Sequence, residues 1–192
     1  MITLILGGSC SGKSAYAERY ITEISGDSQK YYLAAMQASD TDRETQVRIE
    51  RHRMMRRGKG FLTIEQPVSI SGALGKMETG TLGFPKEKTA LLECISNLTA
   101  NEMFLEPIPK PHEAVTDKIV REIGLLNGEL KHLVIVSNNV FEDGVAYDED
   151  TMEYIKALGS INEKLAVMAG RVIEVVAGIP LLIQYGKEDS LI

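Results

Sequence analysis

A glycine-rich motif near the N-terminus constrains the fold of this chain more than any other feature. Residues 7–14 read GGSCSGKS, which matches the pattern G-x-x-x-x-G-K-[S/T]. The apolar run Ile2–Leu6 directly precedes the motif, and Ala15–Ile21, a stretch compatible with a helix, follows it. A strand, a glycine-rich loop and a helix in this order predict a phosphate-binding loop, or P-loop, in an α/β sheet.

The residues of the loop suit a nucleoside triphosphate and a metal ion. Its glycines let the backbone curl so that several N–H groups point into one concavity, beside the positive N-terminal end of the helix. Lys13 is expected to contact the β- and γ-phosphates as a catalytic residue, and the Ser14 hydroxyl is expected to bind Mg²⁺. We expect GTP or ATP to be bound by Gly7, Gly8, Ser9, Cys10, Ser11, Gly12, Lys13 and Ser14. The alternative is a glycine-rich turn without a ligand, which the flanking strand and helix argue against.

Length, charge and cysteine content limit the class of protein further. The 192 residues suit a single nucleotide-binding domain over residues 1–192, and a hydrophobic content of 44% can supply its core. A net charge of −6 argues against a nucleic acid as partner. No apolar run reaches the ~18–20 residues of a membrane span, and the N-terminus lacks the basic segment of a signal peptide, so a cytoplasmic protein is expected. Cys10 and Cys94 show no metal-ligand spacing, and we expect two free thiols rather than a redox pair.

Apolar runs at regular intervals predict the sheet: Ile2–Leu6, Tyr31–Met36, Thr89–Ile95, Leu133–Ser137 and Val172–Ala177, with a further short run at Leu181–Gln184. Their continuous apolar character is typical of parallel strands that are buried on both faces, and helical patterns lie between them. The clearest helix places apolar residues three or four positions apart from Met152 to Met168, with Gly170 as its stop. Residues 71–88 and 106–113 are predicted to be irregular connections. The predicted fold is α/β, of the P-loop NTPase type: a doubly wound, mostly parallel sheet with helices on both faces.

A second candidate site residue, Glu93, ends one of these predicted strands. Ligands of parallel α/β sheets bind beyond the carboxyl ends of the strands, so an acid at this position can hold the metal ion or its water shell. The alternative is an ordinary acid at a strand end, and the P-loop in the same chain favours the metal-binding role. Asn97 and Asn101 follow within two helical turns and could face the same cleft.

A basic segment carries the third candidate. If residues 48–57 are helical, Arg48, His52 and Arg56 lie four residues apart on one face. The two arginines suit a polyphosphate, and nearby cations favour the neutral imidazole, which is the nucleophilic form. Three interpretations remain open at this point: a solvated helix face, a basic helix that binds nucleic acid, and a catalytic histidine.

Together these residues resemble the adenosylcobinamide kinase / adenosylcobinamide-phosphate guanylyltransferase family of cobalamin biosynthesis. The resemblance covers most of the chain. Its most specific part is the spacing Arg48-Ile49-x-x-His52, followed by Thr63-x-Glu65-x-Pro67. The other matching positions are Gly7–Ser14, Tyr32–Ala35, Asp42, Glu44, Arg56, Phe61, Leu91–Cys94, Asn101, Val136–Asn138, Gly159 and Asn162.

The resemblance implies two activities. One is phosphorylation of the hydroxyl on the aminopropanol arm of adenosylcobinamide, and the other is transfer of GMP from GTP onto that phosphate through a covalent guanylyl-histidine. His52 falls on the position of this histidine and is implied to be catalytic, with Arg48, Arg56, Glu65 and Glu93 at the nucleotide. The family also implies a corrinoid substrate and a homo-oligomer with nucleotide sites near subunit contacts.

The chain departs from the family pattern at several positions. They are Cys10 and Ser11, where the family commonly has an arginine in the loop, Asn139–Phe141, where it has Glu-Val-Gly, and Tyr154–Lys156, where it has Phe-Arg-Asp. Two alternatives follow: a P-loop kinase for another small hydroxylated substrate, and a nucleotide-binding regulatory protein without transfer activity. No Asn-Lys-x-Asp element marks a guanine preference, so the choice between ATP and GTP stays open.

Overall fold

The computed structural model describes residues 1–36, 54, 58–77, 88–139 and 147–185. Its strands are β1 (Ile2–Gly7), β2 (Gln29–Ala34), β3 (Phe61–Glu65), β4 (Lys88–Glu93), β5 (His132–Asn138), β6 (Arg171–Val176) and β7 (Ile179–Tyr185). Its helices are α1 (Lys13–Ser25), α3 (Ile95–Phe104), α4 (His112–Glu129) and α5 (Glu149–Met168), with a 3-10 helix, η1 (Ile70–Lys76). Among the helices of these residues, none is long and apolar enough to cross a membrane.

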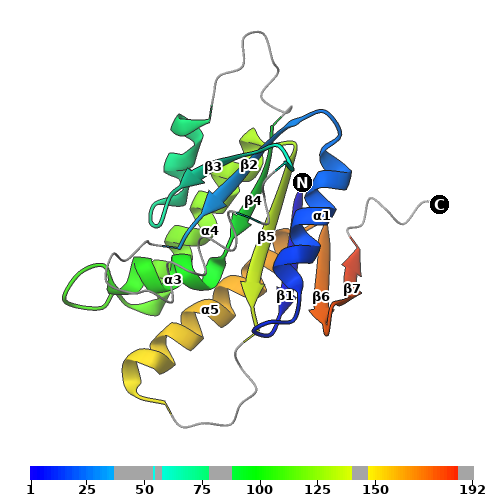
Figure 1. Cartoon of the computed structure of the whole chain (residues 1–192). Coiled ribbons are helices and arrows are strands. Elements are labelled where there is room, and N and C mark those ends of the chain that lie inside the picture. Colours follow the sequence, from blue (N-terminus) through cyan, green and yellow to red (C-terminus); the bar gives the residue numbers. More distant parts are fainter. Residues whose placement is uncertain (37–53, 55–57, 78–87, 140–146, 186–192) are drawn as a thin grey trace.

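A seven-stranded sheet in the order β3-β2-β4-β5-β1-β6-β7 forms the centre of the described fold (Figure 1). Neighbouring strands run parallel except at the edge, where β7 runs antiparallel to β6. Strand β1, which leads into the glycine-rich motif, lies between β5 and β6, and β4 is the next strand beyond β5. The carboxyl ends of β1, β4 and β5 therefore meet at one edge of the sheet. The prediction of a mostly parallel sheet is confirmed.

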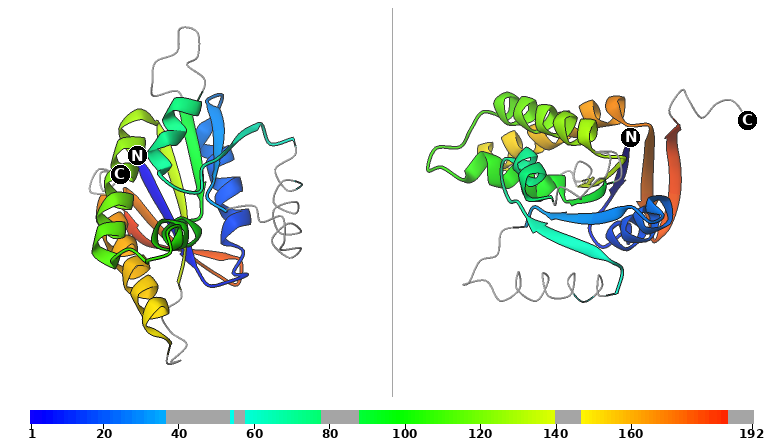
Figure 2. Two further views of the ribbon diagram at one scale, coloured as in Figure 1. Left: turned by 90° about the vertical axis from the view of Figure 1, so that its left-hand side faces the viewer. Right: turned by 90° about the horizontal axis from the view of Figure 1, so that it is seen from above.

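Helices cover both faces of the sheet, as the sequence predicts. Helix α1 packs on one face, and α3, α4 and α5 pack on the other (Figure 2). Strand β1 contributes to both cores: Leu4 packs in the core beneath α3, α4 and α5, whereas Ile5 packs in the core beneath α1. Both residues are fully buried, which explains why this strand appears in the sequence as a continuous apolar run.

Helix α5 begins and ends close to its predicted limits. Asp148 caps its N-terminus by accepting a hydrogen bond from the backbone N–H of Thr151 at 2.8 Å. The helix buries the apolar residues whose spacing predicts it, among them Leu158, Ile161 and Leu165. It ends at Met168, two residues before the predicted stop.

The structure differs from the sequence-based expectation at three places. The apolar runs do not predict β3, because this short edge strand has mostly exposed or half-buried side chains. Residues 71–88 are expected to be irregular, but residues 71–76 belong to η1 and residue 88 begins β4, while residues 78–87 lie outside the described residues. His112, expected within a proline-rich connection, is the first residue of α4.

Buried carboxylates on α3 and α4 explain why η1 is ordered. Glu102, which is 2% exposed, accepts a hydrogen bond from the backbone N–H of Ser69 at 2.6 Å and forms an ion pair with Lys118 at 2.6 Å. Glu122 accepts a longer hydrogen bond, of 3.3 Å, from the backbone N–H of Ser71. These partners lie far apart in the sequence, so the local glycine content of this segment does not reveal them.

Candidate functional site

The predicted phosphate loop connects β1 to α1 at the carboxyl edge of the sheet (Figure 1). Two of its residues have a left-handed backbone, Cys10 with φ 57° and Gly12 with φ 90°. Gly12 is the last residue before α1, whose first residue is Lys13. The loop therefore curls as the motif predicts, although its left-handed positions are Cys10 and Gly12 rather than Gly7 or Gly8.

The turn between β6 and β7 closes the loop from one side. The backbone N–H of Gly178 donates a hydrogen bond to the carbonyl of Ser11 at 2.8 Å. A Cβ on Gly12 would lie 3.3 Å from the Cα of Gly178, and a Cβ on Gly7 would lie 2.6 Å from the carbonyl oxygen of Val175. Two glycines of the motif are thus required by the close approach of this hairpin as well as by the shape of the loop.

Lys13 points back into the loop from the start of α1. Its Nζ donates a hydrogen bond to the carbonyl of Gly8 at 2.9 Å, and the residue is 8% exposed. Burial lowers the pKa of Lys13 from its ordinary value, and the acidic groups of Cys94, Glu93 and Cys10 act in the opposite direction. An ammonium group that is largely removed from water and faces a concavity suits a phosphate, which offers it a charged acceptor.

Ser14 and Glu93, the two predicted metal ligands, meet beside the loop. The Ser14 hydroxyl donates a hydrogen bond to Glu93 Oε1. Glu93 ends β4, which is separated from β1 by β5 alone, so the strand order brings together two residues that are 79 positions apart. The structure therefore brings Lys13, Ser14 and Glu93 together beside the loop.

This pair of oxygen donors suits Mg²⁺. The ion usually binds one or two protein carboxylates and completes its shell with substrate phosphates and waters. Within the described ranges, no group of three or more His, Cys, Asp and Glu side chains comes together that could hold a metal unaided. A hydroxyl and a carboxylate beside a phosphate loop match the ligands of a metal ion that arrives with a nucleotide.

A hydrogen-bond network lies directly behind Glu93. Cys94 Sγ lies 2.9 Å from the hydroxyl of Ser96, which also accepts a hydrogen bond from Asn138 Nδ2 at 2.8 Å. The Tyr154 hydroxyl, on α5, donates to the Ser96 carbonyl at 3.3 Å. Burial raises the pKa of Tyr154 to about 12 and also raises the pKa of the Cys94 thiol. Both groups stay protonated near pH 7 and act as hydrogen-bond partners that fix the ends of β4 and β5.

Two further predicted residues lie at the same edge of the sheet. Glu65 ends β3, four strands away from β1, and its carbonyl accepts a hydrogen bond from Lys76 at 3.0 Å. Asn101, on α3, donates hydrogen bonds to the carbonyls of Ala35 at 2.7 Å and Pro67 at 2.9 Å. Its amide therefore holds together the chain segments that follow β2 and β3.

Three predicted residues, Arg48, His52 and Arg56, lie outside the described residues. Their roles stay predictions from the sequence. The two cysteines are described: Cys10 is exposed, Cys94 is buried, and both are free thiols as expected.

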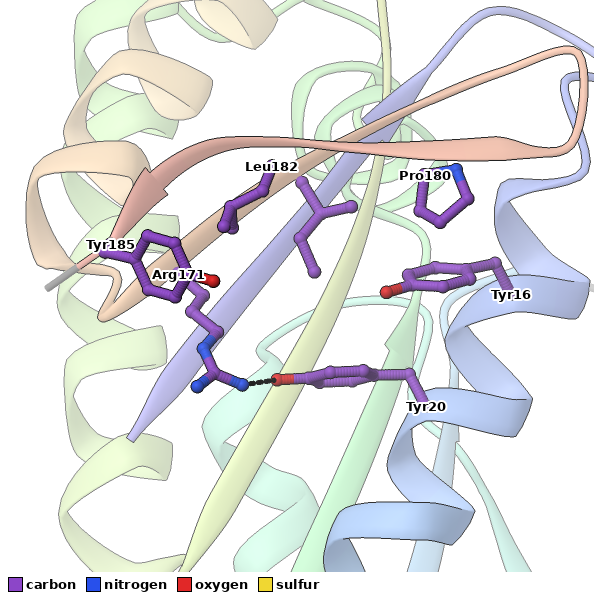
Figure 3. Close-up of a pocket in the computed structure, with 7 residues that line it drawn as sticks. Tyr16, Tyr20, Arg171, Pro180, Leu182 and Tyr185 are labelled. Atoms are coloured by element: carbon purple, nitrogen blue, oxygen red, sulfur yellow. Dashed lines mark hydrogen bonds between the residues drawn. The ribbon is translucent and has the colours of Figure 1, made fainter. Parts of the chain in front are cut away.

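A cavity lies between α1 and the strands β6 and β7 (Figure 3). It has a volume of about 230 Å³ and is lined by Tyr16, Tyr20, Arg171, Ile173, Pro180, Leu182 and Tyr185. The rings of Tyr16 and Tyr20 stack with their centroids 5.9 Å apart, and Arg171 donates a hydrogen bond to the Tyr20 hydroxyl at 3.1 Å. Sequence reasoning missed this cavity because its walls come from both ends of the chain.

Comparison with known proteins decides the family. A family model described as "Cobinamide kinase / cobinamide phosphate guanyltransferase" matches residues 3–183. The chain belongs to this family. The bifunctional adenosylcobalamin biosynthesis protein CobP of Pseudomonas aeruginosa is 30% identical over 182 residues, which cover 94% of this chain and 96% of that protein. The corresponding CobU protein of Escherichia coli is 28% identical, over 96% of this chain and 100% of that protein. The resemblance deduced from the motifs is confirmed, and the chain is a transferase.

Solved structures support the fold. One solved ATPase domain has a TM-score of 0.50 and 10% sequence identity, over 90% of this chain and 68% of that chain. A KaiC-like protein from Pyrococcus horikoshii OT3 has a TM-score of 0.51 and 9% identity, over 90% of this chain and 69% of that chain. The cobinamide kinase / guanyltransferase chain thus has a P-loop NTPase-like fold, as the sequence predicts.

Sequence reasoning also missed the residues that close the loop from the C-terminal part of the chain. Ala177 (φ 50°) and Gly178 (φ 81°) form the tight turn between β6 and β7. A signal for the turn exists, because two apolar runs separated by a short glycine-containing step are typical of a hairpin. The contact of this turn with the loop depends on the pairing of β6 with β1, which the sequence does not reveal.

Proposed function

We propose that this protein phosphorylates the aminopropanol hydroxyl of adenosylcobinamide and transfers GMP from GTP onto the resulting phosphate. The observation that carries the proposal is the contact between Ser14 and Glu93 beside a phosphate loop, in a chain of the cobinamide kinase / guanyltransferase family. Relatives that are named as bifunctional align over 94–96% of this chain. The size and the site of the chain therefore support both activities.

The described residues suit the kinase step. Phosphoryl transfer depends mainly on positioning and on charge stabilisation. Lys13 and the backbone N–H groups of the loop orient the triphosphate, while Ser14 and Glu93 hold Mg²⁺. Mg²⁺ held by these two residues would supply positive charge against the phosphates. The acceptor hydroxyl of the corrinoid then needs to approach the γ-phosphate on the side of β4.

His52 is the proposed nucleophile of the second step. Its neutral imidazole attacks the α-phosphorus of GTP, a P–N bond forms, and pyrophosphate leaves. The GMP then passes to the phosphate of the corrinoid substrate, and the imidazole is regenerated. We propose Arg48, Arg56 and Glu65 as further nucleotide contacts. The position of His52 in the family pattern supports this step.

Self-association is also proposed. All seven residues of β7 are exposed, and none of them is charged. Ile179 and Leu181 are 62% and 46% exposed. An uncharged, apolar edge strand is a template for pairing with another chain, and a second copy offers a self-complementary partner. These features support a homo-oligomer.

Label transfer from GTP tests the histidine step. After incubation with Mg²⁺ and GTP labelled at the α-phosphate, denatured protein should retain the label, lose it in acid and keep it in mild base, as expected for a P–N bond. His52→Asn should abolish labelling and leave GTP binding intact, whereas His112→Asn, which alters another histidine, should label normally. Wild-type protein that takes up no label would exclude the guanylyl-histidine.

The kinase step is tested separately with adenosylcobinamide and ATP or GTP. Phosphorylated product should form with wild-type protein and with His52→Asn, because the histidine takes no part in this step. If adenosylcobinamide is not phosphorylated while another small hydroxylated compound is, the substrate assignment is wrong and the kinase assignment stands.

A further inference from the structure

A cavity lies between α1 and the β6–β7 hairpin, and two of its lining residues, Tyr16 and Pro180, follow closely on residues of the phosphate loop and of the hairpin turn (Figure 3). Tyr16 lies one helical turn after Gly12, and Pro180 lies two residues after Gly178. Gly12 and Gly178 come so close that a Cβ on the first would contact the second at 3.3 Å. One end of the cavity is therefore fixed to the loop by its own backbone contacts.

The metal side of the site determines where the nucleoside lies. Ser14 and Glu93 meet on the β4 side of the loop, and a metal ion held by these two residues would supply positive charge to the terminal phosphates from that side. The α-phosphate and the nucleoside must then extend to the opposite flank. In the strand order that flank is β6 and β7, the strands that line the cavity together with α1.

Tyr16 has the geometry of a stacking platform at this end. Side chains on a helix lean towards its N-terminus, so the ring of Tyr16 covers the turn that begins at the loop. Tyr20 packs on one face of this ring at an interplanar angle of 26°. Pro180 lies on the opposite side of the ring (Figure 3). A planar group that extends from the loop would contact one face of the Tyr16 ring, and Tyr20 supports the other face.

The volume of the cavity limits the size of the ligand that it can bind. Its volume of about 230 Å³ is below the ~300–1,000 Å³ of pockets for drug-sized ligands, so it suits a single ring system and not a corrinoid. Arg171, at the far end of the cavity, begins β6, and Val176 ends it near the loop. The guanidinium of Arg171 donates to the Tyr20 hydroxyl at 3.1 Å and lies over the ring of Tyr185, 5.7 Å from its centroid.

We propose that Tyr16, with Pro180 opposite, stacks against the base of the nucleotide whose phosphates the loop binds. The inference rests on the proposed function, because it needs a nucleoside triphosphate at the loop. Stacking on an aromatic ring tolerates every base. Tyr16 therefore contributes affinity for both ATP and GTP and does not choose between them.

Titration calorimetry with two probes, GTP and inorganic tripolyphosphate, both with Mg²⁺, tests this role. Tyr16→Ala should weaken GTP binding at least about fivefold, the lower end of what base stacking contributes. Its affinity for tripolyphosphate, which has no base, should match that of wild-type protein. Tyr16→Phe keeps the ring and should bind both probes like wild-type protein, as should Tyr185→Ala, which alters the far end of the cavity.

The outcomes separate this inference from the function on which it rests. If wild-type protein binds neither probe, the nucleotide site itself is wrong, and the stacking role falls with it. If wild-type protein binds both probes but Tyr16→Ala leaves GTP affinity unchanged, the base lies elsewhere. An equal loss for GTP and tripolyphosphate in Tyr16→Ala would show damage to the loop and would also overturn the stacking role.

Discussion

The ammonium group of Lys13 is hydrogen-bonded to the backbone of the phosphate loop, and a bound nucleotide can replace this hydrogen bond. Its Nζ donates to the carbonyl of Gly8 at 2.9 Å, and burial lowers the pKa of Lys13. A bound triphosphate offers the ammonium group a charged acceptor, which favours the protonated form and raises the pKa again. Nucleotide binding and the protonation of this lysine are therefore coupled.

Glu93 should act on the metal and not on the nucleotide directly. Replacing it by glutamine keeps the shape and the hydrogen bond from Ser14 but removes the charge that attracts Mg²⁺. We expect Glu93→Gln to bind GTP without Mg²⁺ as wild-type protein does, and to lose at least about tenfold in Mg²⁺-dependent turnover. Steady-state kinetics over a range of Mg²⁺ concentrations measures this, with Glu106→Gln, on an exposed acid, as the control. Turnover equal to that of wild-type protein would leave Glu93 as a structural acid.

Some residues of the site can be predicted from the sequence because each has a local marker. Ser14 belongs to a motif with fixed spacing, and Glu93 follows a continuous apolar run that identifies a buried strand. Ser96 and Tyr154 have no such marker. Their hydrogen bond joins α3 to α5 across 58 positions and exists only after the two helices pack.

At the scale of elements, the β6–β7 hairpin forms part of the wall of the loop. The carbonyl of Val175 occupies the space next to Gly7, and Gly178 fills the space next to Gly12. The motif is usually explained by the backbone shape that phosphates require. In this fold, close packing against the hairpin places a second restriction on the same glycines.

A matched pair of substitutions separates these two requirements. Gly7→Ala places a Cβ 2.6 Å from a backbone oxygen, which overpacks the contact and should cost about 1–3 kcal/mol of unfolding free energy. Gly8→Ala meets no atom within 4 Å and has no positive φ to strain, so its stability should stay close to wild type. Thermal unfolding without nucleotide measures both. Equal midpoints for the two variants would contradict a tight contact between loop and hairpin.

The N-terminal cap of α5 should make stability depend on pH. The carboxylate of Asp148 accepts hydrogen bonds from the backbone N–H and hydroxyl of Thr151, and these bonds lower the pKa of Asp148. A lowered pKa in the folded state gives stability that is present above the ordinary aspartate pKa, about 3.9, and is lost as the pH falls through the folded value.

Asparagine caps helices as well as aspartate does but does not titrate. The stability of wild-type protein relative to Asp148→Asn should therefore fall as the pH is lowered from 7 to 3. Urea unfolding at several pH values measures the difference. A difference that stays constant across this range would show that the charge of Asp148 does not contribute.

Elements with a strong internal period could be predicted, and those held by distant partners could not. Helix α5 and strands β1, β4 and β5 follow directly from their apolar patterns. The 3-10 helix η1 lies in a glycine-rich segment, and buried carboxylates of two other helices hold it in place. Strand β3 lies at an edge of the sheet, where few side chains need to be apolar.

At the scale of the whole molecule, the two edges of the sheet differ. One edge, β3, is a short strand of five residues. The other edge, β7, presents seven exposed and largely apolar residues. The strand order that creates these edges could not be derived from the sequence, because apolar runs identify strands but not their neighbours. The position of β7 points to the side on which a second copy would bind.

A single charge on β7 should separate the copies. Leu181 lies opposite Glu174 on β6, so Leu181→Lys can form a cross-strand ion pair and should leave the fold of each chain intact. In the proposed oligomer the same lysine would oppose apolar groups of a second copy, and light scattering should show a shift towards the 21.1 kDa monomer. Ile108→Lys, a similar change at a residue that is 82% exposed in the connection between α3 and α4, should leave the oligomer unchanged. A monomeric wild-type protein would contradict self-association altogether.

The position of β1 between β5 and β6 has a consequence for synthesis of the protein. A ribosome makes the glycine-rich motif well before residues 139 and 178, but the backbone N–H groups that fasten the motif belong to Asn139 and Gly178. Chain growth from the N-terminus must therefore pass residue 178 before the loop has its full set of contacts. A nascent chain carries the phosphate-binding motif long before it carries a nucleotide-binding site, and the last strands of the sheet decide when that site becomes functional.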